Sequence, residues 1–130
     1  MRPSPRRLAG ALLLLAACGG SEPTSTAGTL TAAFFQGNSN AGAVLITISG
    51  GPVESVTGLG GSGQQVSFAS AGLGTTKVVV LGGVQNGDLF KFRVPDVSQA
   101  AKYTARIDQV ADQVTFSLLD PAAYTLTIHK

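Results

Sequence analysis

The sequence predicts an all-β protein, a single antiparallel β-sandwich of about nine strands. Three observations lead to this prediction. Apolar and polar residues alternate in short segments, which is typical of half-buried strands. Turn-forming residues separate these segments at roughly 8–12-residue spacing, as in jelly-roll and immunoglobulin-like sandwiches. The chain has 130 residues, which leaves room for one domain.

Residues 1–17 are predicted to be a signal peptide outside this fold. Arg2, Arg6 and Arg7 form a basic segment, and an apolar run follows over residues 8–17. As a helix that run would span roughly 15 Å, about half of a bilayer's hydrocarbon core, so it indicates secretion and not a membrane span. The twin arginines also suggest twin-arginine export, but their neighbours lack the rest of that motif, which favours the general secretion route.

The end of this segment resembles a lipobox, the cleavage motif of bacterial lipoproteins. Its residues are Leu15-Ala16-Ala17-Cys18. The resemblance implies cleavage before Cys18, lipidation of its thiol and stable anchoring by two or three acyl chains. The alternative is an ordinary signal peptide with a chance cysteine. Gly19 stands where an aspartate would imply retention in the inner membrane, so the resemblance implies the outer membrane of a bacterial cell envelope.

Cleavage would change the charge of the chain. Nine Lys and Arg against seven Asp and Glu give +2, and loss of three arginines leaves six against seven, or −1. The pI of about 9.0 therefore belongs to the precursor, and no basic stripe remains to bind nucleic acid. Because Cys18 is the only cysteine, no thiol nucleophile, disulfide or Cys/His zinc site is expected in the folded domain.

The mature chain is predicted to begin with a lipidated cysteine and a flexible tether over residues 18–28. Residues 19–28 are small and polar and have no apolar period. Ten such residues reach roughly 17 Å, which would keep the sandwich near the membrane. The β-sandwich domain is predicted over residues 29–130.

The strands are assigned from the alternation. It is strict in the segments 89–94, 103–108, 114–118 and 124–129. The segments 43–48 and 77–81 are more continuously apolar, as expected of central strands, and weaker candidates are 30–35, 53–59 and 65–69. From this phase we expect one core containing Leu45, Val79, Phe90, Phe92, Ile107, Phe116, Leu126 and Ile128.

Turn residues and one helical segment complete the prediction. Asn86-Gly87 is the strongest hairpin dipeptide, because both residues tolerate positive φ. Turns are also expected at residues 37–40 and 50–52 and at Asp120-Pro121. The only helical candidate is the segment 97–102, with Asp96 as its N-cap.

The residue patterns that suggest chemistry are weak. Gly58–Gly63 matches G-x-G-x-x-G, but a strand follows it where a dinucleotide site needs a helix. His129 is the only imidazole, so a Ser-His-Asp arrangement would have to use it. Asp108 and Asp112 are candidates for a shared Ca²⁺, although solvated loop acids are the simpler interpretation. We therefore expect neither catalysis nor a cofactor.

The aromatic residues mostly fall on the inward phase and are predicted to form core. Phe34 and Phe35 are the exception, since adjacent residues on a strand point to opposite faces. One of them is then a candidate for a binding patch, against coverage by a neighbouring segment. A carbohydrate is the alternative ligand, although the chain has no Trp.

From Leu45 onward, the order of segments resembles the cohesin-like domains of bacterial surface and cellulosome proteins. The similar segments are 44–48 followed by 53–56, 76–81, 87–94 and 103–112. The resemblance implies a nine-stranded jelly-roll sandwich, which in that family binds dockerin modules through a sheet face. Ser49–Pro52 replaces the family's early Tyr-Asp-Pro-like turn, so the partner is not carried over.

These observations favour a membrane-anchored, non-enzymatic protein-binding or structural module. Its outward residues Thr104, Arg106, Thr125 and Thr127 are candidates for one binding face if their strands are adjacent. The carbohydrate-binding module is the alternative function.

Overall fold

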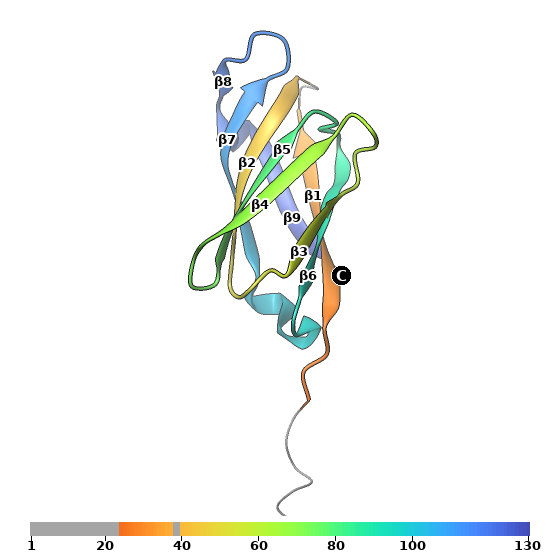
Figure 1. Ribbon diagram of the computed structural model, residues 1–130. Helices are drawn as coiled ribbons and strands as arrows, with labels where there is room; N and C mark the ends of the chain where they lie inside the picture. The colour runs from red at the N-terminus through yellow and green to blue at the C-terminus, as the bar shows by residue number, and fades with distance from the viewer. Residues whose placement is uncertain (1–23, 38–39) are drawn as a thin grey trace, which may run out of the picture.

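The computed structural model describes residues 24–37 and 40–130. Within these residues nine strands form two facing antiparallel sheets, so the predicted all-β sandwich is confirmed (Figure 1). The elements are β1 (Gly28–Gln36), β2 (Ala41–Ser49), β3 (Ser55–Gly58), β4 (Gln65–Gly72), β5 (Thr75–Leu81), β6 (Gly87–Val94), the 3-10 helix η1 (Val97–Lys102), β7 (Thr104–Asp112), β8 (Leu118–Leu119), the 3-10 helix η2 (Pro121–Ala123) and β9 (Tyr124–His129).

The chain passes repeatedly between the two sheets. One sheet has the strand order β3-β6-β1-β9, and the other has the order β4-β5-β2-β7-β8. Only β4–β5 and β7–β8 are consecutive strands that pair directly, so every other connection crosses from one sheet to the other. The edges of the sandwich are therefore β3 and β9 in one sheet and β4 and β8 in the other.

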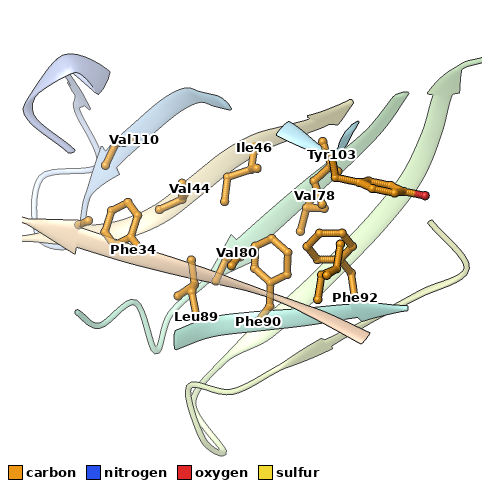
Figure 2. Packing of buried hydrophobic residues seen from close by; sticks show 14 of the residues in the cluster. Phe34, Val44, Ile46, Val78, Val80, Leu89, Phe90, Phe92, Tyr103 and Val110 are labelled. Carbon is orange, nitrogen blue, oxygen red and sulfur yellow. The ribbon is translucent and has the colours of Figure 1, made fainter. Parts of the chain in front are cut away.

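The core lies between the sheets, and its side chains come from the inward phase of each central strand (Figure 2). The largest fully buried side chains are Phe34, Phe90, Phe92, Leu30, Ile46, Ile48, Leu89, Val44, Val78, Val80, Val94 and Val110. All of them lie within the span of the nine strands. The residues before Gly28 thus supply neither a strand nor a buried core side chain among those described.

Several elements agree with the sequence prediction. In β6, Phe90, Phe92 and Val94 are buried while Lys91 and Arg93 are exposed. Ile107, Leu126 and Ile128 pack against the core, although each is only partly buried. The helical segment is η1, and the side chain of its N-cap Asp96 accepts a hydrogen bond from the backbone N–H of Ser98.

The prediction was wrong for Leu45 and Val79, which lie half-buried on the outer face of the five-stranded sheet. The inward residues of β2 are Val44, Ile46 and Ile48, and those of β5 include Val78 and Val80. Within the apolar runs around Leu45 and Val79 the two phases look alike, although Thr47 and Lys77 of the outward phase are polar. Packing against the other sheet decides between them.

The prediction was also wrong for the segment 114–118. Most of it is a turn, only Leu118 belongs to β8, and Phe116 is 80% exposed instead of buried. The alternation is present, but Asp112 accepts hydrogen bonds from the backbone N–H groups of Val114 and Thr115, which bend the chain before a strand can form. Local side-chain capping has replaced sheet pairing here.

The Asn86-Gly87 pair marks a turn but not a hairpin. Gly87 has a φ of +102°, as the dipeptide predicts. The turn joins β5 to β6, which belong to different sheets. The side chain of Asn86 accepts a hydrogen bond from the backbone N–H of Gln36 at 2.8 Å, so the turn is held against the end of β1.

Candidate interaction surface on the five-stranded sheet

The chain enters the sandwich at the end where η1 lies (Figure 1). The carbonyl of Thr26 accepts a hydrogen bond from the backbone N–H of Val97 at 2.8 Å. A Cβ on Gly28 would lie 2.7 Å from the Cβ of Val97, so glycine permits this close contact. The predicted lipidation site Cys18 and the signal peptide lie outside the described residues. The far end of β1, at Gln36, faces away from this entry point.

The outer face of the five-stranded sheet changes in character along the strands. Outward residues of β5, β2 and β7 that are register partners form rows across the three strands. From the entry end, the successive rows are Thr75–Ser49–Thr104, Lys77–Thr47–Arg106, Val79–Leu45–Gln109 and Leu81–Ala43–Ala111, the last of which continues to Leu118 in β8. The face is therefore polar near the entry, charged in the middle and apolar at the opposite end.

The charged row is organised by Asp108. The register between β2 and β7 shifts between Leu45 and Ile46, where Asp108 is left without an opposite residue. This bulge turns the carboxylate toward the neighbouring strands. Asp108 accepts hydrogen bonds from the hydroxyl of Thr47, from Lys77 Nζ at 2.9 Å and from Arg106 Nε at 2.8 Å. Lys77 Nζ also donates to the Thr47 hydroxyl at 2.6 Å.

These contacts keep Asp108 ionised. Partial burial opposes its ionisation, but the hydrogen bonds from Thr47, Lys77 and Arg106 outweigh it and hold the pKa of Asp108 at about 2. The Thr47 hydroxyl donates to the carboxylate and accepts from an ammonium group, and a carboxylate with a pKa of about 2 is too weak a base to activate the hydroxyl. A threonine nucleophile would need a stronger base. The cluster instead joins β5, β2 and β7 across the outer face.

The apolar end of the face contains a groove of about 590 Å³. Its floor includes Ala43, Leu81 and Ala111, and Phe116 forms one wall. A smaller hollow of about 230 Å³ continues it over Leu45 and Val79. The two share Ala43 and Ala111. We call this continuous surface the hairpin-end groove, because the β7–β8 connection borders it.

The β7–β8 connection presents apolar side chains beside this groove. Val114 is 75% exposed and Leu118 is 68% exposed. The turn is held by backbone hydrogen bonds from Phe116 N to the carbonyl of Asp112 at 3.1 Å and from Asp112 N to the carbonyl of Ser117 at 2.9 Å. These bonds give the exposed apolar groups a defined position.

Phe116 has an unusual backbone conformation within this turn. It is the only described non-glycine residue with a positive φ, at 61°. The left-handed region costs a residue with a Cβ roughly 1–2 kcal/mol, and strained residues of this kind cluster at functional sites. The left-handed conformation of Phe116 therefore lowers the stability of the fold, and it holds an exposed phenyl ring at the rim of an apolar groove.

The carboxylates of Asp108 and Asp112, the candidates for a shared Ca²⁺, have separate partners within the protein. Asp108 is bonded to two cations, and the Oδ1 atom of Asp112 accepts from Val114 N at 2.8 Å and Thr115 N at 2.9 Å. These backbone bonds lower the pKa of Asp112. Over residues 24–37 and 40–130, no three His, Cys, Asp or Glu side chains gather in a way that would hold a metal ion.

His129 forms an exposed ion pair instead of a catalytic triad. Its Nε2 atom lies 2.8 Å from Asp88 Oδ1, and its Nδ1 atom lies 3.0 Å from the carbonyl of Lys130. The bond with Asp88 and then the one with Lys130 raise the pKa of His129. Both ring nitrogens lie against oxygen atoms, and no serine hydroxyl is positioned against either nitrogen in these contacts.

The glycine-rich segment 58–63 has a packing explanation. The Gln64 side chain accepts a hydrogen bond from Gly60 N at 2.9 Å and donates to the carbonyl of Leu89 at 3.2 Å. A Cβ on Gly58 would lie 2.1 Å from Gln64 Oε1. The glycines make room for this amide. Strand β4 follows the loop, so no helix N-terminus is present to bind a pyrophosphate.

The expectation for Phe34 and Phe35 is confirmed in part. Phe34 is buried and stacks on Tyr124 with ring centroids 5.5 Å apart. Phe35 is 48% exposed on the outer face of the four-stranded sheet. Of the other exposed phenylalanines of the described chain, Phe68 lies in β4 of the other sheet and Phe116 lies in the β7–β8 turn, so the exposed rings do not form one platform.

The outward threonines and Arg106 do not form one face. Thr104 and Arg106 belong to β7 of the five-stranded sheet, whereas Thr125 and Thr127 belong to β9 of the four-stranded sheet. Their neighbours Ala105 and Leu126 pack inward. The two pairs therefore point outward from opposite faces of the sandwich.

Sequence reasoning missed the hairpin-end groove and the role of Asp108. Asp112 followed by Val114 and Thr115 is a recognisable side-chain capping pattern, and it would have placed a turn there. Neither the bulge at Asp108 nor the positive φ of Phe116 has a comparable sequence signal.

Comparisons with known proteins give no relative for this chain. No family model matches it, and neither a curated protein nor a solved structure matches it significantly. In the part of the chain that the structure describes, no helix is long and apolar enough to cross a membrane.

Proposed function

We propose that the protein is a lipid-anchored, non-enzymatic binding module of the bacterial cell envelope, at the outer membrane, and that it engages a protein through the hairpin-end groove. The observation that carries the binding site is Phe116, an exposed aromatic residue held in a left-handed conformation at the groove's rim. Aromatic anchors beside apolar pockets are typical of the residues that dominate protein interfaces.

The arrangement of the two ends supports this proposal. The described chain enters the sandwich beside η1, and the β7–β8 connection lies at the other end (Figure 1). Gln113 and Phe116 of that connection line the groove. An anchor at Cys18 would leave the groove accessible to a partner. The groove's apolar floor and absence of paired aromatic rings suit an apolar peptide side chain better than a sugar ring.

The anchor is tested by growing cells with labelled palmitate. The full chain should incorporate the label, and the Cys18→Ser variant should not, because the thiol is the only group that can form the thioether. Cells expressing Ala17→Ser provide a matched control, since serine is also a small residue at the cleavage site. Equal labelling of the full chain and Cys18→Ser would refute lipidation at this residue.

The binding site is tested by pull-down from envelope extract, using the chain from residue 18 with Cys18→Ser. Phe116→Gly should abolish capture of any partner. It should also leave the domain folded and at least as stable, because glycine adopts a positive φ without strain. Phe35→Gly, at the exposed ring on the opposite sheet, should retain the partner.

A glycan array run in parallel distinguishes the protein-binding module from the alternative, a carbohydrate-binding module. A protein captured by the parent chain and lost only with Phe116→Gly supports the proposal. Binding to one glycan class that depends on the exposed Phe35 would replace it with a carbohydrate-binding module. Retention of the protein partner by Phe116→Gly would exclude the hairpin-end groove.

A further inference from the structure

The four edges of the two sheets differ in how well they are protected against pairing with another chain. An edge strand exposes unpaired backbone N–H and C=O groups, and natural proteins usually protect it with shortness, charge or proline. β3 has four residues, and β8 has two and is followed by Asp120 and Pro121. β9 has six and ends at His129, which pairs with Asp88.

β4 has none of these protections. It has eight residues, Gln65–Gly72, of which none is charged and none is proline. No charged residue occurs anywhere between Glu54 and Lys77. Its register with β5 is regular from Gln65 to Ser70, and the one irregularity lies next to Gly72, at the hairpin. The long, regular part of the edge is therefore open to pairing.

Exposed apolar side chains gather along the same edge. Phe68 lies in the middle of β4 and is 43% exposed, although its register partner Val78 is fully buried. Leu73 is fully exposed at the turn after β4, and Leu59 is exposed in the loop before it. β4 thus carries an exposed apolar residue at its centre and one just beyond its end. Leu59 begins the preceding loop beside β6, where its backbone N–H donates to the carbonyl of Leu89 at 3.0 Å.

We propose that β4 pairs antiparallel with β4 of a second copy of this chain, joining two five-stranded sheets into one sheet of ten strands. This inference does not depend on the proposed function. A second copy fits because an uncharged edge meets its own copy without opposing like charges, and a two-fold interface requires one self-complementary patch.

The pleat restricts the register of this pairing. Val66 and Phe68 point inward and Ser67 and Ala69 outward, so a continuous sheet must pair inward with inward residues. Centring the two-fold axis on Phe68 places the two exposed Phe68 rings opposite each other. It also places Ser67 opposite Ala69 of the second copy, so small residues flank the aromatic pair on both sides.

The same register also covers Leu73. The turn with Leu73 and the loop that precedes β4 lie at opposite ends of the strand. An antiparallel copy therefore brings each Leu73 turn beside the preceding loop of the other chain. The two tethers leave this dimer at opposite ends, so both anchors reach one membrane only when the strands lie along its surface.

The dimer is tested by sedimentation velocity of the chain from residue 18 carrying Cys18→Ser. All strands lie within residues 28–129, so this chain keeps the whole sandwich. Strand pairing at one edge buries less than the ~800 Å² per partner of standard interfaces, so we expect a concentration-dependent dimer between low micromolar and about 1 mM protein. Ser67→Lys should weaken it at least about tenfold, since edge lysines block pairing. Thr125→Lys, on the β9 edge, should not.

The register is tested by cross-linking, because this chain contains no other cysteine. Residues directly opposite each other in an antiparallel pair have Cα atoms ~4.5–5.5 Å apart, which allows a disulfide. A mixture of Ser67→Cys and Ala69→Cys chains should form the mixed disulfide faster than either chain forms its own.

Each outcome decides the proposal. A dimer lost in Ser67→Lys, with mixed disulfides, supports it. A monomer at every concentration overturns it. If the β4 amides are protected from hydrogen exchange only when envelope extract is added, the edge binds a different protein, which also overturns it. A dimer unaffected by Ser67→Lys overturns the interface, and faster self-cross-linking of either cysteine variant overturns the register.

Discussion

Substitution of Phe92 by alanine is expected to lower the free energy of unfolding by about 3–5 kcal/mol. The Phe92 side chain is 1% exposed, and its ring lies 6.2 Å from that of Phe90 and 6.1 Å from that of Tyr103. Figure 2 shows these rings between the two sheets. The hydrogen-bonded strands cannot close the cavity that alanine leaves. The loss is a large share of the ~5–15 kcal/mol that stabilises a domain.

The adjacent residue supplies the control for this prediction. Lys91 is exposed on the outer face of the same strand, so Lys91→Ala should change the free energy of unfolding by less than about 0.5 kcal/mol. Urea denaturation followed by circular dichroism measures both variants. Similar losses for Phe92→Ala and Lys91→Ala would show that the inward phase of β6 is wrong.

Substitution of Asp108 by alanine is expected to lower the free energy of unfolding by about 2 kcal/mol at pH 7. The pKa of Asp108 falls from its ordinary value of 3.8 to about 2, and each pKa unit corresponds to ~1.4 kcal/mol. Its side chain is 16% exposed, so solvent screens these contacts only in part. Arg106→Ala removes the most exposed partner and should cost less than about 1 kcal/mol.

Because of the same contacts, we expect the free energy of unfolding to depend on pH. A carboxylate whose pKa is lower in the folded state stabilises the fold above its unfolded pKa of 3.8, and it loses this contribution as the pH falls through about 2. Asp96 and Asp112 also have lowered pKa values, so the parent chain is acid-sensitive at several residues. The Asp108→Asn variant should lose less stability than the parent chain between pH 4 and about 2.

Urea denaturation at pH 7, 4, 3 and about 2 measures this difference. The free energy difference between the parent chain and Asp108→Asn should be largest at pH 7 and shrink toward pH 2. A constant difference over this range would mean that the cluster with Thr47 and Lys77 does not hold the Asp108 carboxylate ionised in the folded protein.

The sequence predicted the strands whose two faces differ in polarity. In β6, lysine and arginine alternate with phenylalanine and valine, and burial follows that alternation. In β2 and β5 the apolar runs around Leu45 and Val79 hide the polarity of the outer face. Thr47 and Lys77 lie in phase with these two residues and were the signal that they point outward. The continuity of these segments did indicate that β2 and β5 lie away from the sheet edges, as the strand order confirms.

The sequence predicted where a turn occurs but not which strands the turn connects in space. Asn86-Gly87 marks a turn because glycine adopts a positive φ at little cost, but the dipeptide cannot say whether the next strand joins the same sheet. The segment 114–118 had the alternation of a strand, and the hydrogen bonds accepted by Asp112 turned it into a loop. The candidate surface depends on that loop, and for this reason the sequence did not reveal it.

The sequence by itself determined the all-β class, the number of strands and the helical segment after Asp96, because alternation and capping are properties of neighbouring residues. The lipid anchor on Cys18 and the resemblance to cohesin-like domains stay predictions from sequence. Only the tertiary structure decided how Asp108 joins three strands and where Phe116 is exposed. Those features arise from contacts between residues far apart in the chain, which no local pattern encodes.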